Sequence, residues 1–449
     1  MTQLHRIIVG LGTTGLSCAR YLRAKNEPFE VVDSRLNPPG LAQFKLEFSD
    51  VALSLGDFSQ ELLCSADELL LSPGISLQTP QIKAAAKAGV RIVGDIALFC
   101  AAVQRPIVAV TGSNGKSTVV TLLAMMMRES GLSVGLGGNL DGEQAAPALD
   151  LLRQAPKDIY ILELSSFQLE TTPTLAAKAA VILNVSDDHM DRYSSKHEYE
   201  AAKQRIFAGV DKAIVNRDDS ATQPWDVATA TVASFGLDAP MEGQWGIIED
   251  NGQAYLACGN ERVLSVQSLK IAGKHNIANA LAALALGDAV GLSHASMVDA
   301  LRAFSGLPHR CQWLRTLRGV DYYNDSKGTN VGATVVAIES LGEMIRGKLV
   351  LIAGGVDKGA DFSMMAPVVE KFVKLAILIG RDAKNIAASF KGSIEVIFAS
   401  SLPEAVQIAA EKAKEGDAVL LSPACASFDM FSDFTHRGRV FVETVEALK

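Results

Sequence analysis

Residues 111–118 read TGSNGKST, and this stretch decides the fold. The usual phosphate-binding P-loop is G-x-x-x-x-G-K-[ST], but Val110 stands where its first glycine would be, and Gly112 follows two residues later. An apolar strand at 107–110 precedes the loop and a helix follows it, which is the context that a phosphate loop requires. We therefore predict a shortened loop that binds a nucleoside triphosphate; a glycine turn without a ligand is the alternative.

The loop suggests a role for each of its polar residues. Lys116 is expected to bridge the β and γ phosphates, and Ser117 or Thr118 to offer a hydroxyl to Mg²⁺. Glycine frees backbone N–H groups to converge on an anion, and the helix N-terminus adds a favourable dipole. The residues that we predict to bind ATP here are Gly112, Ser113, Asn114, Gly115, Lys116, Ser117 and Thr118.

Size and composition restrict the class of protein. The chain has 449 residues, 48% of them hydrophobic, so two or three domains with real cores are expected. A net charge of -8 argues against a nucleic-acid partner. The six cysteines form no C-x-x-C pair, there is no signal-peptide pattern, and no apolar run reaches the roughly 20 residues that cross a bilayer. We expect a cytoplasmic protein without membrane insertion.

The chain divides into three α/β units, with expected boundaries near 95 and 305. In the first, strands at RIIVG, FEVVDSR and ELLLSPG alternate with helices. In the second, the apolar runs in DIYILELSS and AAVILNVSDDHMDRY predict a parallel sheet covered on both faces. Residues 220–270 predict a small antiparallel sheet with a hairpin at Asp250-Asn251-Gly252. In the third, strands are expected in KLVLIAGG, KLAILIG, IEVIFA and AVLLSPA.

Two polar residues follow apolar strands of the central unit. Glu163 ends the strand IYILEL, at the carboxyl edge of the sheet where open α/β sheets bind ligands, and we predict that it is a Mg²⁺ ligand. A surface glutamate is the alternative. His189 follows the next strand among three aspartates, DDHMD. It either lies near the metal and phosphate or belongs to a polar loop, and the residues alone leave both open.

Lys203 is the most informative single residue of the central unit. It lies in SSKHEYEAAKQRIF, which begins with a capping box, Ser195-x-x-Glu198. The helical spacing from Tyr199 places Lys203 on the apolar side, and an ammonium withdrawn from water tends to lose its proton. A neutral amine reacts with CO₂ to form a carbamate, an anionic oxygen ligand for Mg²⁺. A lysine that snorkels to solvent is the alternative.

The N-terminus carries a second glycine motif. Gly10-x-Gly12-x-x-Gly15 follows the first strand, and Asp33 ends the second. By themselves these residues suggest a dinucleotide site, with Asp33 on the ribose. They therefore leave a nicotinamide-dependent oxidoreductase open, although this reading explains neither the phosphate loop nor Lys203.

Together these features resemble the Mur ligases, ATP-dependent amide-forming enzymes of peptidoglycan precursor synthesis, whose short loop is T-G-x-N-G-K-[ST]. The resemblance extends over the whole chain through GLGTTGLS, LSPGI, ELSSFQLE, DDHMDRY, GKHNIANALAALA, GLPHR, NDSKGTN and SPACASFDMF. These stretches look most like the members that add D-glutamate to UDP-N-acetylmuramoyl-L-alanine. Gly328, in NDSKGTN, departs from the small residue such as alanine that we expect there.

The resemblance implies a three-domain α/β fold and a place for each substrate. A Rossmann-like domain at 1–95 would bind the UDP substrate, a P-loop ATPase-like domain at 96–305 would bind ATP, and a Rossmann-like domain at 306–449 would bind D-glutamate. The UDP-substrate residues would be Thr13, Thr14, Asp33, Ser34, Arg35, Gly74 and Asn139. Further ATP-binding residues would be Asn276, Asn279, Arg310 and Asp325, and the D-glutamate residues would be Lys327, Thr329, Lys358, Ser427, Phe428 and Phe434.

The resemblance also implies the chemistry. Lys116, Glu163, His189 and Lys203 would be catalytic, and two Mg²⁺ ions would be held by Ser117, Glu163, His189 and carbamylated Lys203. The substrate carboxylate would become an acyl phosphate, which the D-glutamate amine then attacks. A monomer is expected. The alternatives are a related ligase with another amino acid, the oxidoreductase, and a nucleotide-gated binding protein without turnover.

Overall fold

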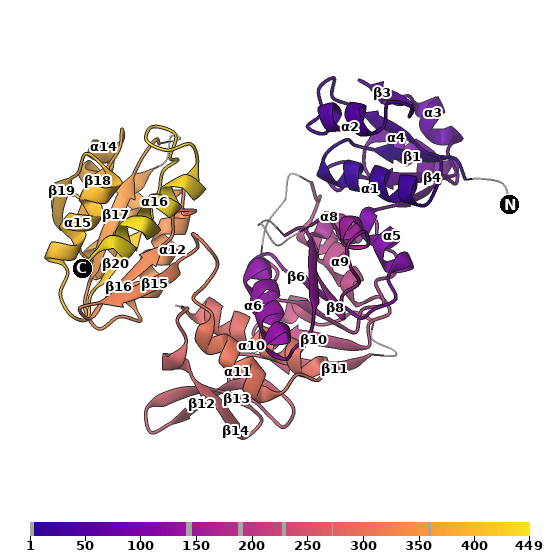
Figure 1. The fold of residues 1–449 in the computed structure, drawn as a ribbon. Helices are drawn as coiled ribbons and strands as arrows, with labels where there is room; N and C mark the ends of the chain where they lie inside the picture. Colours follow the sequence, from indigo (N-terminus) through magenta and orange to yellow (C-terminus); the bar gives the residue numbers. More distant parts are fainter. Residues whose placement is uncertain (1–3, 141–145, 187–191, 227–229, 272, 358–360) are drawn as a thin grey trace. The chain divides into compact units, whose positions relative to one another are not determined.

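The computed structural model describes residues 4–140, 146–186, 192–226, 230–271, 273–357 and 361–449. The chain forms two compact units: residues 1–264 with 279–300, and residues 265–278 with 301–449. The first unit contains two sheets and the second contains one (Figure 1). Within the described residues, no helix is both long and apolar enough to cross a membrane. The α/β class is confirmed, whereas the boundaries near 95 and 305 remain predictions.

The first sheet is parallel and has the strand order β3-β2-β1-β4-β5. Its strands are β1 (Arg6–Val9), β2 (Glu30–Asp33), β3 (Leu53–Leu55), β4 (Glu68–Leu71) and β5 (Arg91–Val93). The helices between and after them are α1 (Thr13–Ala24), α2 (Leu41–Glu47), α3 (Gln60–Ser65), α4 (Pro80–Lys87) and α5 (Asp95–Ala102). Ile7 and Ile8 point to opposite faces and are both fully buried, as expected of a central strand covered on both sides.

The glycine motif after β1 is explained by close packing. Gly10 has φ +100°, and a Cβ at Gly15 would lie 2.0 Å from the Gly10 carbonyl oxygen. Only glycine at position 15 lets α1 start so close to the end of β1. Gly10 and Gly15 therefore shape a tight strand-to-helix turn, whereas a Cβ at Gly12 would meet nothing within 4 Å.

The second sheet has nine strands in the order β14-β13-β12-β11-β10-β9-β6-β8-β7. They are β6 (Ile107–Thr111), β7 (Val134–Gly138), β8 (Ile159–Glu163), β9 (Ala179–Ile182), β10 (Lys212–Asn216), β11 (Thr231–Phe235), β12 (Trp245–Asp250), β13 (Gln253–Cys258) and β14 (Glu261–Ser265). The associated helices are α6 (Lys116–Glu129), α7 (Ala148–Leu151), α8 (Ser166–Glu170), α9 (Lys196–Gln204), α11 (His294–Ala303) and the short 3₁₀ helices η1 (Arg205–Phe207) and η2 (Ser220–Thr222). The 3₁₀ helix η3 (Val266–Ser268) follows β14 and belongs to the second unit. The buried helix α10 (Lys274–Ala289) contains the division between the two units.

The predicted hairpin is confirmed at Asp250-Asn251-Gly252. Strands β12 and β13 pair antiparallel, Asp250 faces Gln253, and both turn residues have positive φ, +51° and +75°. That conformation matches a type I′ turn, which an Asn-Gly pair favours. The strands do not form a separate sheet, however, because Trp245 of β12 pairs with Phe235 of β11. The antiparallel strands continue the main sheet at one edge.

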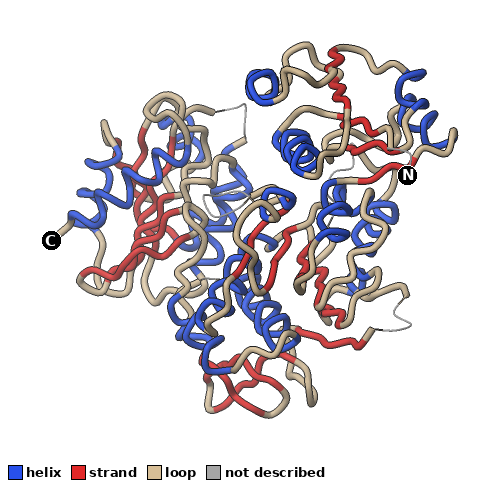
Figure 2. The backbone as a smooth tube through the Cα atoms, turned by 45° about the vertical axis from the view of Figure 1, so that its right-hand side comes forward, coloured by secondary structure: helices blue, strands red, loops and turns tan. Residues whose placement is uncertain are grey.

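The second unit contains a six-stranded sheet in the order β15-β16-β20-β17-β18-β19. Its strands are β15 (Gln312–Leu317), β16 (Val320–Asn324), β17 (Leu349–Gly354), β18 (Val373–Ile379), β19 (Glu395–Phe398) and β20 (Ala418–Leu421). Its helices are α12 (Val331–Gly342), η4 (Phe362–Met365), α13 (Ala366–Phe372), α14 (Ala383–Ser389), α15 (Leu402–Lys412) and α16 (Phe434–Ala447). Separate buried clusters cover its two faces, and Figure 2 shows its strands with helices beside them. The antiparallel pair β15–β16 was not expected from the sequence.

Candidate active site

The phosphate loop lies between β6 and α6 in the first unit (Figure 1). Gly115 precedes α6 with φ +86°, and a Cβ there would lie 2.3 Å from Asn279 Oδ1. The backbone conformation therefore favours glycine, and a larger residue would also have to displace the Asn279 amide. The same contact places Asn279, a predicted ATP ligand on α10, directly against the loop.

Lys116 begins α6 and folds its side chain back over the loop. Its Nζ donates to the carbonyl oxygens of Gly112 at 2.9 Å and of Ser113 at 3.0 Å. The ammonium is therefore held at the loop itself, within reach of a phosphate bound there.

Ser117, Glu163 and Asn139 meet beside the loop. Glu163 is 2% exposed; its Oε2 accepts a hydrogen bond from Ser117 Oγ at 2.8 Å and its Oε1 one from Asn139 Nδ2 at 3.4 Å. Strands β6, β7 and β8 are parallel neighbours, so their carboxyl ends bring these three residues to one edge. A buried carboxylate and a hydroxyl are hard oxygen donors of the kind that Mg²⁺ prefers.

The segment after β9 fixes the other side of the loop. Asn184 accepts at Oδ1 from Asn114 N at 2.9 Å and donates from Nδ2 to Asn114 O at 3.1 Å. Ser113 Oγ lies 3.2 Å from Tyr199 Oη, and it accepts from Ser186 N at 3.0 Å. These contacts were not predicted from the sequence. The predicted residue His189 lies outside the described residues.

Lys203 is buried, as its spacing predicts. The residue is only 2% exposed, and its Nζ donates to the Gly112 carbonyl oxygen at 3.0 Å. The ammonium also lies 4.5 Å from the centre of the Tyr199 ring. The side chain points toward the phosphate loop and does not snorkel to solvent.

The capping box before this helix is only half formed. Ser195 Oγ accepts from Glu198 N at 3.3 Å, as predicted. The Glu198 carboxylate, however, accepts from Ser194 N at 3.0 Å, one residue before the cap. The helix start is therefore capped by the serine alone.

The predicted UDP-substrate residues occupy different environments. Thr13 and Thr14 begin α1, Ser34 and Arg35 follow β2 at the surface, and Gly74 is exposed in the loop after β4. Asn139 lies instead beside Glu163, as described above.

Asp33 is buried, and its carboxylate is hydrogen-bonded to other residues of the protein. Its carboxylate accepts from Leu11 N at 2.7 Å and from the Arg35 guanidinium at 2.7 and 2.9 Å. Burial opposes ionisation, but the hydrogen bonds from Arg35 and Leu11 outweigh it and hold the pKa of Asp33 below its usual value. Asp33 thus fixes the glycine turn, and its contact with the UDP substrate stays a prediction.

In the second unit, the predicted residue Asp325 is buried and hydrogen-bonded. It accepts from Ser422 Oγ at 2.7 Å and from Cys311 N at 3.1 Å, and burial raises its pKa to about 6. Its hydrogen-bond partner Cys311 follows Arg310, and both Cys311 and His309 have positive φ, +43° and +64° respectively. Non-glycine residues in this conformation carry strain, which structures tend to keep where function needs it.

Apart from Lys358, the predicted D-glutamate residues of this unit lie in the loop after β16, in the loop after β20 and at the start of α16. Lys327 Nζ lies 4.9 Å from the centre of the Phe434 ring, and Thr329 N donates to the Lys327 carbonyl at 2.8 Å. Ser427 is buried, whereas Phe428 is 71% exposed. Lys358 lies outside the described residues. Asn276 belongs to this unit, three residues before Asn279 of the first.

Sequence reasoning missed Arg437, which joins two of these loops. It is 1% exposed and donates to Ser326 Oγ at 3.0 Å, Ser326 O at 2.7 Å and Cys425 O at 3.2 Å. Burial lowers its pKa to about 10. The signal was its spacing, four and eight residues before the buried Phe441 and Val445 on one face of α16.

Family models match three stretches of the chain. The Mur ligase MurD-like N-terminal domain matches residues 4–94, the Mur ligase middle domain matches residues 110–287, and the Mur ligase glutamate ligase domain matches residues 309–425.

Whole-length relatives agree with these matches. A protein of Pseudomonas aeruginosa named UDP-N-acetylmuramoylalanine–D-glutamate ligase is 52% identical over 99% of this chain and 98% of its own length. One of the same name from Marinobacter nauticus is 51% identical over 98% of both chains. The crystal structure of a UDP-N-acetylmuramate–alanine ligase from Thermotoga maritima shares the fold, with a TM-score of 0.58 and 20% identity over 99% of this chain and 100% of that one. The chain belongs to the Mur ligase family.

Proposed function

We propose that this protein is an ATP-dependent ligase that joins D-glutamate to UDP-N-acetylmuramoyl-L-alanine in peptidoglycan precursor synthesis. The reaction class is supported by one observation above all: Ser117 and the buried Glu163 meet at 2.8 Å beside the phosphate loop. The choice of substrates is supported by relatives of that name that share about half of their residues along the whole length.

ATP is assigned to the loop. The loop amides, Lys116 and the α6 N-terminus favour its phosphates, and Asn279 lies against Gly115 on the other side. Ser117 and Glu163 would hold Mg²⁺, which fits two adjacent oxygen donors. When bound, the ion would neutralise charge on the phosphoryl group during transfer.

The first step forms an acyl phosphate. A carboxylate oxygen of the L-alanine group attacks the γ-phosphorus of ATP, and the bond from that phosphorus to the ADP oxygen breaks. Lys116 is placed to balance the charge that develops on the transferred group. The loop contributes by orientation and charge, and no side chain has to form a covalent bond with substrate.

In the second step the amine of D-glutamate attacks the acyl carbon. The tetrahedral intermediate loses a proton from nitrogen and expels inorganic phosphate, leaving the amide. The binding residues that we propose for D-glutamate are Lys327, Thr329, Lys358, Ser427, Phe428 and Phe434, together with Arg310 and Asp325 for ATP in the same unit. For the UDP substrate we propose Thr13, Thr14, Asp33, Ser34, Arg35, Gly74 and Asn139.

A second Mg²⁺ site is proposed at Lys203 and His189. The Lys203 ammonium is withdrawn from water and directed at the Gly112 carbonyl. A carbamate formed there would supply an anionic oxygen to the ion. We further propose a monomer of three domains, 1–95, 96–305 and 306–449, in the cytoplasm, where the six free thiols would persist.

The test is phosphate release by the purified full chain with ATP, Mg²⁺, UDP-N-acetylmuramoyl-L-alanine and a panel of amino acids. Release is expected with D-glutamate and not with L-alanine, L-glutamate or a diamino acid. Preference for another amino acid would redirect the proposal to a different member of the family. Phosphate release in the absence of both UDP-N-acetylmuramoyl-L-alanine and an amino acid would contradict the coupling of ATP cleavage to amide formation.

A further inference from the structure

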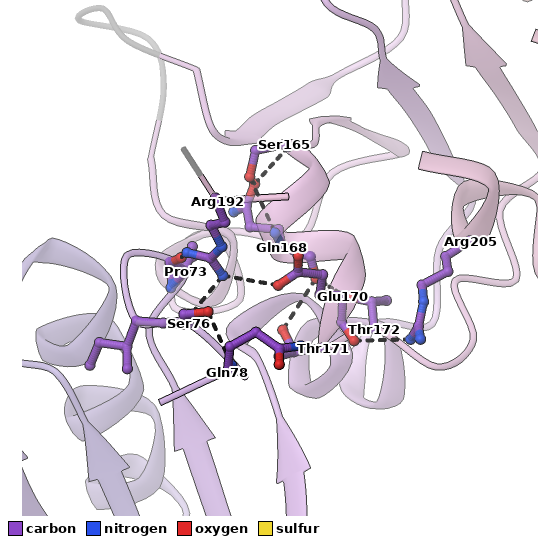
Figure 3. Close-up of polar contacts among 11 residues, drawn as sticks. Pro73, Ser76, Gln78, Ser165, Gln168, Glu170, Thr171, Thr172, Arg192 and Arg205 are labelled. Carbon is purple, nitrogen blue, oxygen red and sulfur yellow. Dashed lines mark hydrogen bonds and ion pairs between the residues drawn. The ribbon is translucent and has the colours of Figure 1, made fainter. Parts of the chain in front are cut away.

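Arg192 joins the loop after β4 to the end of helix α8, two segments that are far apart in the sequence. Its Nη1 donates to the Pro73 carbonyl at 2.8 Å, and its Nη2 donates to the Ile75 carbonyl at 3.3 Å and to Glu170 Oε2 at 2.9 Å (Figure 3). The guanidinium carbon of Arg192 lies over the Phe167 ring, 4.0 Å from the centre of the ring. The arginine side chain is only 12% exposed, so this is a nearly buried, charge-assisted contact.

The loop that Arg192 holds contains Gly74, a proposed UDP-substrate residue. On its other side this loop rests on the glycine turn after β1, because Ser72 Oγ donates to the Gly10 carbonyl at 3.1 Å. A Cβ at Gly10 would lie 2.9 Å or less from Ser72 and Ile75. Residues 72–75 are therefore fixed between the glycine turn and the guanidinium.

Arg192 also continues into contacts with the phosphate loop. The next residue, Tyr193, has its ring 6.0 Å from that of Phe167 and 5.3 Å from that of Tyr199. The Tyr199 hydroxyl in turn lies 3.2 Å from Ser113 Oγ. A continuous set of packed side chains thus runs from the Gly74 loop to the ATP loop.

We propose that Arg192 is a positioning residue for the UDP-linked substrate. It holds residues 73–75 in the shape that receives this substrate, so a chain without it must order the loop upon binding, at a cost in affinity. The name of the substrate rests on the proposed function; the positioning role rests on the contacts above. ATP binding should be affected little, because Asn184 fixes the ATP loop independently.

Arg192→Ala and Arg192→Lys test this role in steady-state phosphate release by the full chain. Arg192→Ala is expected to raise KM for UDP-N-acetylmuramoyl-L-alanine roughly tenfold or more, because it loses hydrogen bonds from a charged donor. KM for ATP should stay within about twofold. Lysine keeps the charge but cannot fork to two carbonyls, so an intermediate KM is expected.

Arg205→Ala is the matched control. Arg205 is exposed and donates to the Glu170 carbonyl at 2.9 Å, so it shares a partner residue with Arg192 without touching residues 73–75. Its KM values should equal those of the wild type. An unchanged KM for the UDP substrate in both Arg192 variants would overturn the proposal, and so would an equal rise in the KM of every substrate.

Calorimetric binding of UDP-N-acetylmuramoyl-L-alanine, without turnover, separates this inference from the proposed function. If wild type binds the compound but releases no phosphate, the proposed function fails, and weaker binding by the folded Arg192→Lys variant still supports the positioning role. If that variant binds as tightly as wild type, the positioning role fails whatever the turnover. An Arg192 variant is taken as folded if its melting temperature equals that of Arg205→Ala. If Arg192→Ala melts at a lower temperature, the binding and KM values of Arg192→Lys decide whether Arg192 positions the substrate.

Discussion

Ser117 donates its hydroxyl hydrogen bond to Glu163 across 2.8 Å, joining the first turn of α6 to the end of β8. Glu163 is buried and keeps a second contact to Asn139. If phosphates bind this loop as we propose, a carboxylate beside them would be repelled unless a cation lay between the two. The pair therefore marks the side of the loop at which we propose Mg²⁺.

Glu163→Gln keeps the shape of this site and removes its charge. We expect phosphate release to fall by roughly two orders of magnitude or more, because stabilisation of the transferred phosphoryl group is lost. Titration of Mg²⁺ at fixed ATP should show a higher half-saturating concentration. Glu129→Gln, at the exposed far end of α6, is the control and should behave as wild type. Equal activity in the two variants would exclude Glu163 from the metal site.

Gly115→Ala tests the shape of the loop, and Gly131→Ala is its control. Both glycines flank α6 with similar φ, +86° and +82°, so each substitution should cost about 1–2 kcal/mol of unfolding free energy. Only at Gly115 does the new methyl meet a neighbour, Asn279 Oδ1 at 2.3 Å, whereas the space around Gly131 is open. ATP affinity should therefore fall in Gly115→Ala alone. Urea unfolding and nucleotide binding measure the two effects, and equal ATP affinity in both variants would contradict the packing argument.

Lys203→Ala should abolish turnover while the protein remains folded. The buried amine directed at the phosphate loop would be gone, and with it the proposed carbamate. Short carboxylic acids such as acetate should restore part of the activity by occupying the emptied space as an oxygen ligand. Lys196→Ala, at the exposed start of the same helix, should retain wild-type rates and show no response to acetate. Normal activity of Lys203→Ala would remove the carbamate from the mechanism.

Asp95 predicts a pH dependence of stability. It is buried at the start of α5, its Oδ1 has no hydrogen-bond partner within the described residues, and burial raises its pKa from 3.8 to about 6. Because the folded state binds this proton more tightly than the unfolded state, the associated stability is complete below the unfolded pKa and is lost as pH rises through the folded pKa.

Asp95→Asn removes this titration. Its stability relative to wild type should fall by about 2 kcal/mol between about pH 8 and about pH 4.5, since each pKa unit corresponds to about 1.4 kcal/mol. Urea unfolding at the two pH values measures the difference. Asp158→Asn, whose carboxylate is exposed on the loop before β8, should lack this trend. A pH-independent difference for Asp95→Asn would show that its pKa is unshifted.

Features encoded by neighbouring residues could be predicted from the sequence. The phosphate loop follows from glycine, lysine and serine within eight positions, the Asn251-Gly252 turn from its φ requirement, and the burial of Lys203 from helical spacing. Each of these depends on local backbone geometry, which short stretches specify well.

Features that depend on distant partners could not be predicted. The hydrogen bond from Leu11 N to the Asp33 carboxylate joins residues 22 positions apart, and no local pattern predicts it. The role that we propose for Arg192 depends on its hydrogen bond to the Pro73 carbonyl, more than a hundred residues earlier in the chain. Likewise, no local pattern reveals that Trp245 pairs with Phe235 and joins the antiparallel strands to the main sheet.

The central claim is that the phosphate loop transfers a phosphoryl group from ATP to the carboxylate of a UDP-linked acid. The most direct measurement uses UDP-N-acetylmuramoyl-L-alanine with ¹⁸O in that carboxylate, together with ATP, Mg²⁺ and D-glutamate. Mass spectrometry of the released inorganic phosphate should find one ¹⁸O atom per phosphate, since the acyl oxygen leaves with phosphorus. Unlabelled phosphate formed alongside the amide product would contradict the account.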